Sequence, residues 1–101
     1  MSLSQHYDSN NNTLVIAIKD KFDFNLVQDF RSAYADIHPD TKNVEVDLRE
    51  ASYMDSSALG MLLNMHKALK DQVTEISISN ANAQLKKILQ ISRFDKKFTI
   101  D

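Results

Sequence analysis

The sequence contains no cysteine and no tryptophan, and it has one glycine, Gly60, and one proline, Pro39, among 101 residues. Without cysteine the chain can form neither a disulfide framework nor a thiolate metal site, and it offers no thiol nucleophile. The single glycine excludes the glycine-rich loops of dinucleotide and P-loop sites, because those loops need several glycines for close approach of the backbone to phosphate.

Strong charge of one sign and long apolar runs are also missing. There are 12 Lys and Arg residues against 14 Asp and Glu, which gives a formal net charge of −2, and no block of five or six like charges occurs. We therefore expect no nucleic-acid partner. The apolar run 14–18 is far shorter than the roughly twenty residues of a membrane-spanning helix, so no membrane insertion is expected. The first residues show no secretory signal, which predicts a cytoplasmic protein.

Length and periodicity together predict one small α/β domain over residues 1–101. The hydrophobic fraction of 43% suffices for one core. The asparagine run 10–12 is a turn signal between two extended segments, and Asn25 with Gln28 resembles a capping box. Apolar spacing predicts a hairpin of 3–8 with 14–18, further strands at 44–48, 75–79 and 98–100, and helices at 25–37, 58–70 and from about Asn82. This order predicts a small mixed, mostly parallel sheet of four or five strands with three or so helices.

The segment 49–57 is the candidate site, because ligands and partners of open α/β sheets meet the carboxyl ends of the strands. It leads from the strand 44–48 to the helix 58–70. The simplest interpretation is that Asp55 or Ser56 is the N-cap of that helix, which stabilises it by about 1 kcal/mol.

A wider pattern resembles the STAS family, which includes the bacterial anti-sigma factor antagonists. It consists of the strand 44–48, the motif Met-Asp-Ser-Ser-Ala-Leu-Gly at 54–60, the segment Leu-Lys-Lys-Ile-Leu at 85–89, Phe94 and the segment 98–100. The resemblance covers nearly the whole chain, and its most specific part is 44–70. The chain lacks glycines that the family usually has before the aspartate of the first strand–helix junction, in the phosphorylation loop and after the second helix.

The resemblance implies that Ser56 is a phosphoacceptor, supported by Asp55 and Ser57. Asp23 matches the family's aspartate at the end of the preceding strand, whose loop lies beside the phosphorylation loop. Asp23 and Asp55 could also help to hold magnesium at a kinase partner's site, or one could raise the pKa of the other.

By resemblance the protein is a partner-switching regulator in signal transduction rather than an enzyme, with no cofactor and no metal. It binds a regulatory protein while Ser56 is unphosphorylated and releases it on phosphorylation. The implied partners are a serine kinase, either anti-sigma-factor-like or borne by a response regulator, a metal-dependent serine phosphatase, and the downstream regulatory protein. The alternative is a constitutive STAS subunit of a transporter or another multiprotein assembly.

The helix 58–70 offers the expected contact surface. Asn64 and Lys67 lie on its polar stripe, with Met61 and Leu63 at the apolar margins, so these four residues are the predicted partner-binding residues. The alternative interpretation is an ordinary solvated helix face.

Other candidate residues carry weaker signals. The three histidines, His6, His38 and His66, lack metal-ligand spacing, and His66 falls on the apolar side of its helix, where a packed imidazole is expected. A Ser-His-acid hydrolase would need a Gly-x-Ser-x-Gly elbow, which is absent. The basic residues are interpreted as a solvated face, with phosphate or RNA binding as the alternative; they are Lys86, Lys87, Arg93, Lys96 and Lys97.

Overall fold

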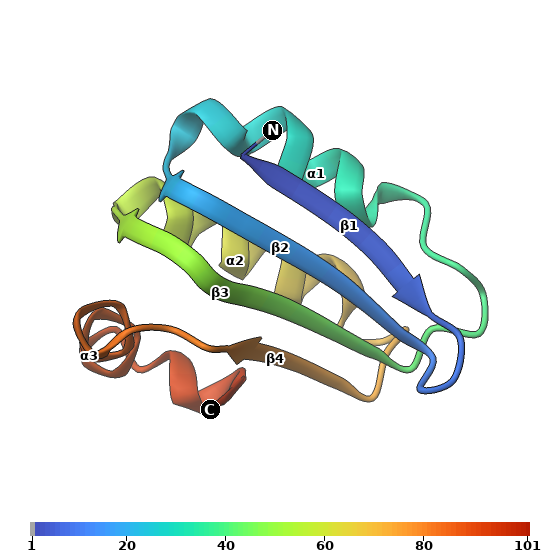
Figure 1. The fold of residues 1–101 in the computed structure, drawn as a ribbon. Coiled ribbons are helices and arrows are strands. Elements are labelled where there is room, and N and C mark those ends of the chain that lie inside the picture. The colour runs from blue at the N-terminus through green and yellow to red at the C-terminus, as the bar shows by residue number, and fades with distance from the viewer. Residues whose placement is uncertain (1) are drawn as a thin grey trace.

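The computed structural model describes residues 2–101, which form a five-stranded sheet with three α-helices and two 3-10 helices (Figure 1). The elements in chain order are β1 (Leu3–Asp8), β2 (Thr13–Phe22), the 3-10 helix η1 (Phe24–Leu26), α1 (Val27–Ala35), β3 (Asn43–Met54), α2 (Ser56–Leu69), β4 (Glu75–Ser79), α3 (Ala83–Ile91), the 3-10 helix η2 (Phe94–Lys96) and β5 (Thr99–Ile100). The predicted α/β class and the mixed, mostly parallel sheet are confirmed.

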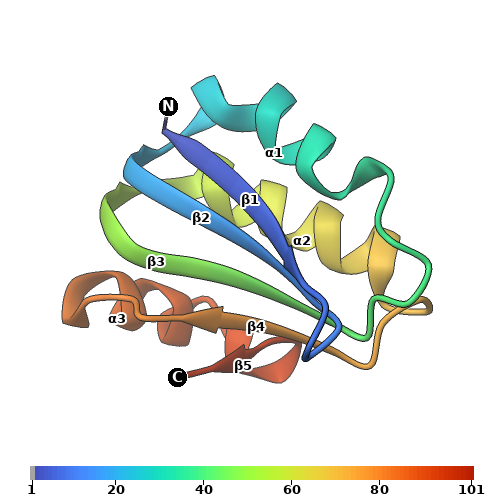
Figure 2. The same cartoon turned by 45° about the vertical axis from the view of Figure 1, so that its right-hand side comes forward.

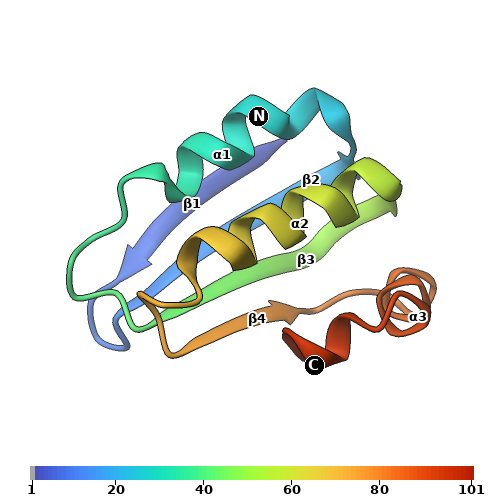
Figure 3. The same ribbon diagram turned by 180° about the vertical axis from the view of Figure 1, so that it is seen from behind.

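The strands lie in the sheet in the order in which they occur in the chain. β1 and β2 form the predicted antiparallel hairpin, whereas β2–β3, β3–β4 and β4–β5 are parallel. The crossovers place α1 and α2 side by side on one face, as the view from behind shows (Figure 3). α3 lies beyond the carboxyl end of β4 and contacts β3. The parallel pairing brings the carboxyl ends of β2 and β3 to the same edge.

The core lies between the sheet and the helices α1 and α2. Alternate residues of the central strands are buried on that face, among them Ile16, Val46 and Ile78, because side chains of a strand alternate between its two faces. Leu62 on α2 and Phe30 on α1 cover them and are themselves buried. Full burial of each such side chain contributes about 1.5–3 kcal/mol, so this layer fixes α2 on the sheet.

The two central strands are longer than the sequence predicts. β2 continues to Phe22 and β3 to Met54, so most of the expected loop 49–57 is strand, and α2 begins at Ser56 rather than Ala58. The register between β2 and β3 shifts twice, and Asp20 has a positive φ of 64°. A bulge of this kind lets pairing continue while the simple alternation of apolar residues is lost, which is why the sequence pattern ended early.

Helix ends differ in smaller ways. The expected capping box of Asn25 and Gln28 is wrong, because Asp23 makes the cap: its carboxylate accepts a hydrogen bond from the backbone N–H of Asn25 at 3.0 Å. The predicted start of the third helix at Asn82 is confirmed, since its side chain accepts from the N–H of Leu85 at 2.8 Å. Within the described part of the chain, none of the helices has the length and apolar character needed to cross a bilayer.

Candidate functional site

The candidate site lies where β2 and β3 end side by side (Figure 1). Phe22 pairs with Met54 as the last residues of the two strands. The next residue is an aspartate in both cases, Asp23 and Asp55, and each caps the helix that follows it. The structure therefore places Asp23 and Asp55 at equivalent positions of two neighbouring strand–helix junctions.

Asp55 holds the first turn of α2 through a single carboxylate oxygen. Its Oδ1 accepts from the N–H of Ser57 at 3.0 Å, the N–H of Ala58 at 3.3 Å and the hydroxyl of Ser57 at 2.5 Å. The hydrogen bond from the Ser57 hydroxyl, followed by those from the two N–H groups, lowers the pKa of Asp55 below its ordinary value. The alternative of a raised pKa at Asp55 is therefore wrong, and the carboxylate is charged at neutral pH.

The two serines of the motif have different surroundings. The Ser57 hydroxyl donates to Asp55 and is half-buried. Ser56, the first residue of α2, is exposed, and its side chain makes no hydrogen bond to any other residue of 2–101. A helix N-terminus favours anions because its first N–H groups have no partner within the helix. Of the two serines of the motif, Ser56 is therefore the more accessible one.

Exposed apolar side chains surround this edge. Phe24 is 68% exposed and follows Asp23, while Tyr53 is 45% exposed and stands at the end of β3. On α2, Leu63 is 39% exposed and lies about two turns from Ser56 on the same side of the helix. Sequence reasoning missed Phe24 and Tyr53. Tyr53 carried a signal, because its neighbour Met54 faces the core and successive residues of a strand face opposite sides. Phe24 carried none, because it lies in η1, after the strand has ended.

Three of the four predicted contact residues are exposed, namely Leu63, Asn64 and Lys67, but Met61 is only 5% exposed. The expectation that Met61 lies at the surface is wrong because α1 packs beside α2. Ala68, two turns after Met61 on the same side, lines the gap to Tyr34 at the end of α1. The side of α2 that carries Met61 is thus covered by the neighbouring helix.

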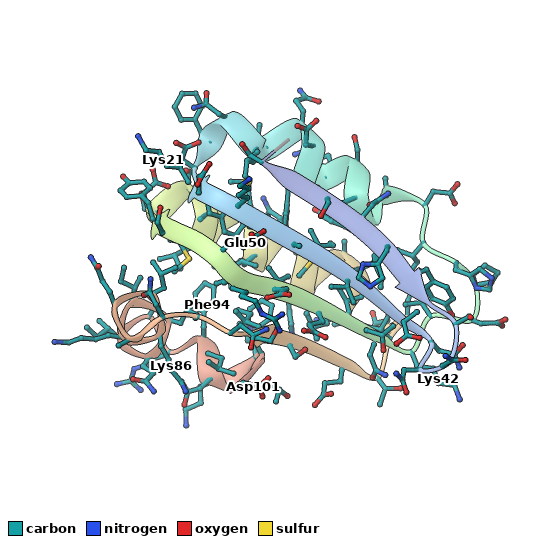
Figure 4. The ribbon with its side chains drawn as sticks, viewed as in Figure 1. Lys21, Lys42, Glu50, Lys86, Phe94 and Asp101 are labelled. Atoms are coloured by element: carbon teal, nitrogen blue, oxygen red, sulfur yellow. The ribbon has the colours of Figure 1, made fainter. Side chains whose placement is uncertain are left out.

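A hollow of about 470 Å³ opens beside the junction at the end of β2, where Lys21 is labelled in Figure 4. Its lining is mainly polar and includes Asp20, Asp23, Asn25 and Ser52. The Ser52 hydroxyl donates to the carbonyl of Asp20 at 3.3 Å, which ties β3 to the irregular end of β2. This contact shapes the edge on which Asp23 and Asp55 stand.

Ser56 has no histidine close along its own helix. His66 lies ten residues further, which is about 15 Å of helix. Its ring packs against Phe98 with the ring centroids 5.3 Å apart, as expected for a packed imidazole. Within residues 2–101 no three His, Asp or Glu side chains are grouped closely enough to hold a metal ion.

Comparison with known proteins gives a consistent family. The model of the STAS domain family matches residues 5–101. A STAS-domain containing protein of Pseudomonas aeruginosa (strain UCBPP-PA14) is 44% identical over 87 residues, which are 86% of each chain.

Solved structures share the fold at low sequence identity. The anti-sigma factor antagonist SpoIIAA in its unphosphorylated form is 18% identical with a TM-score of 0.69, covering 88% of this chain and 82% of its own. The phosphorylated form of SpoIIAA from Bacillus has a TM-score of 0.70 at 18% identity, covering 98% and 90%. A sulfate transporter family protein from Wolinella succinogenes has a TM-score of 0.75 at 14% identity, covering 90% and 73%. By its family match and its fold, the chain belongs to the STAS domain family.

Proposed function

We propose that this STAS domain is a phospho-regulated partner-switching protein, similar to the anti-sigma factor antagonists. It binds a regulatory protein while Ser56 is unphosphorylated and releases that protein when Ser56 is phosphorylated. The observation that carries the proposal is the exposed Ser56 hydroxyl, which makes no hydrogen bond within residues 2–101, beside exposed apolar side chains. The existence of SpoIIAA in unphosphorylated and phosphorylated forms supports it.

Phosphorylation is expected to leave the fold in place. A phosphate on Ser56 adds about −1.5 to −2 charges at neutral pH. The N-terminus of α2 stabilises an anion by roughly 0.3–1 kcal/mol, whereas the charged Asp55 next to it repels the phosphate. These opposing effects are of similar size, so the change is felt mainly by a docked partner.

A partner that covers Ser56 must contact the apolar side chains beside it. Phe24, Tyr53 and Leu63 supply the apolar contacts, with Asn64 and Lys67 as polar contacts further along α2. Covering a phosphate dianion with such a surface removes its water without replacing the hydrogen bonds. A penalty of only about 3 kcal/mol weakens binding roughly a hundredfold, which is enough for a switch.

The proposal implies three partners. A serine kinase, anti-sigma-factor-like or borne by a response regulator, adds the phosphate; a metal-dependent serine phosphatase removes it; and a downstream regulatory protein is held in between. We place this cycle in the cytoplasm, and we assign the STAS domain itself a binding role rather than a catalytic one.

Mass spectrometry of the protein isolated from its native cells tests the proposal. A phosphatase-sensitive phosphate is expected on the peptide that contains Ser56. Ser56→Ala should retain the partner in all growth states, whereas authentic phosphoserine at 56 should release it. Ser57→Ala is the matched control and should still be phosphorylated and switched. An unmodified chain in every growth state, or an unchanged affinity of the phosphorylated protein, would contradict the proposal.

A second function is favoured by the structural similarity to the sulfate transporter family protein. In that case the domain is a constitutive subunit of a transporter or a comparable assembly, and Asp55 serves only to cap α2. Stable co-purification with membrane proteins, unaffected by Ser56→Glu, would identify this function and separate it from the switch.

A further inference from the structure

A second cleft lies at the opposite edge of the sheet from Ser56. It has a volume of about 530 Å³ and is formed by the last turn of α2, the start of β4 and the segment from η2 to β5. Along α2, Lys70 is about 20 Å from Ser56. Lys21 and Lys42, labelled in Figure 4, lie near these two edges.

The cleft exists because the last strand is very short. β5 pairs only with Ser77 and Ile78 of β4, so the start of β4 has no strand on its outer side. Figure 2 shows β5 beside β4, with η2 just before it in the chain. Phe98, between η2 and β5, packs against His66 of α2 and closes the floor of the cleft.

Three lysines border this cleft: Lys70, Lys96 and Lys97. Two carboxylates, Glu75 and Asp95, also line it, yet the single ion pair found in residues 2–101 joins His38 to Asp40 and involves none of these groups. Glu75 instead accepts a hydrogen bond from the Thr99 hydroxyl at 2.9 Å. The three ammonium groups are therefore gathered at one cleft without a carboxylate partner in contact.

The His66 imidazole at the floor of the cleft lies in the electrostatic field of the neighbouring lysines. Burial lowers the pKa of His66, and the positive charges of Lys97 and Lys70 lower it further. Lys97, directly after η2, and Lys70, directly after α2, thus both act on this imidazole. The cleft is positive although the chain as a whole has a formal charge of −2.

We propose that this cleft binds the diphosphate or triphosphate group of a small anion. Lysines bind phosphate as mobile point charges, and three of them from two segments of the chain can reach several phosphate oxygens at once. The hydroxyl of Thr74 adds a polar group at the exposed start of β4. Because Glu75 and Asp95 interrupt the positive surface, a compact anion fits it better than a nucleic-acid strand.

An ordinary explanation predicts a different result. Lys70 stands at the carboxyl end of α2 and Lys96 at that of η2, where a positive charge stabilises a helix without any ligand. In that case any salt affects the signals of the cleft to a similar degree, and a polyphosphate shows no saturable binding.

Titration of the full chain with sodium pyrophosphate at constant ionic strength tests the inference. Calorimetry measures the affinity, and the amide signals in NMR spectra show which residues respond. We expect saturable binding that affects residues of the cleft. Lys70→Gln with Lys97→Gln should weaken it by about tenfold or more, as expected for removing two direct charge contacts. Lys19→Gln with Lys87→Gln removes the same charge from exposed positions outside the cleft and should leave the affinity unchanged.

A separate readout is the NMR titration of the His66 imidazole, whose pKa should rise when pyrophosphate is bound. The charged groups facing this imidazole around the cleft are Lys70, Lys96, Lys97, Glu75 and Asp95. Equal affinity for pyrophosphate and ATP would identify an inorganic ligand, and tighter binding of ATP a nucleotide; both support the site. No saturable binding, or equal weakening in both lysine pairs, overturns it. The test does not depend on Ser56 or on the proposed switch.

Discussion

Truncation of Met61 and truncation of Leu63, two residues apart on α2, should affect different properties of the protein, because Met61 lies in the core and Leu63 at the surface. Met61 is 5% exposed beneath the neighbouring helix, and Leu63 is 39% exposed on the side that carries Ser56. Both are apolar residues that sequence reasoning assigned to the partner surface. We predict that Met61→Ala loses stability and that Leu63→Ala loses partner binding.

The magnitudes follow from burial. Truncation of a buried Met to Ala removes about 2–5 kcal/mol from the free energy of unfolding, because apolar contacts are lost and a cavity remains. For a domain of this size that corresponds to a fall in Tm of roughly 10–25 °C. Leu63→Ala removes only partly buried surface and should cost about 1 kcal/mol or less. At a docked interface, however, the same truncation removes a contact next to Ser56 and should weaken binding about tenfold.

Urea unfolding followed by circular dichroism measures the first effect, with an unchanged m-value as the check that the transition stays two-state. Affinity for the captured regulatory partner measures the second, at a temperature where both variants are folded. Equal destabilisation by the two substitutions would refute the assignment of Met61 to the core and Leu63 to the surface. Full partner affinity in Leu63→Ala would remove Leu63 from the docking surface.

Three further predictions concern stability. The folded-state pKa of Asp55 lies below its ordinary value of 3.8, so its charge stabilises the protein above about that pH, and this contribution is lost as the pH falls through the folded pKa. In urea unfolding, the stability advantage of the unmodified protein over Asp55→Asn should therefore shrink in acid. Parallel pH profiles of the two proteins would contradict this. The pKa of His66 in the folded protein is lowered below the ordinary histidine value of 6.5, so just below pH 6.5 the unfolded chain binds more protons than the folded one. The free energy of unfolding should therefore fall as the pH drops through that range. His66→Gln should remove this pH dependence, whereas His6→Gln should keep it. Arg93 follows α3 in the left-handed conformation, with φ 61° and ψ 32°, so Arg93→Gly should raise the free energy of unfolding by about 0.5–1 kcal/mol, whereas Arg93→Ala should bring no gain in thermal melts.

The sequence by itself determined the class of fold and the position of the Asp-Ser-Ser motif at the start of α2. Alternating apolar residues in β3 and β4 and the helical period of α2 and α3 specify elements whose order leaves few topologies. The cap at Asp55 was also readable, because an aspartate ahead of an apolar helical pattern is a local signal. Local signals of this kind depend only on residues a few positions apart.

The tertiary structure decided which residues of that pattern are accessible. The bulged pairing of β2 with β3 turned an expected loop into strand, and the packing of α1 beside α2 buried Met61. Phe24 and Tyr53 gained their place at the candidate site because two strands end together. The cleft bordered by Lys70, Lys96 and Lys97 arises because β5 is two residues long. These features depend on contacts between segments distant in the chain, so no window of sequence contains them.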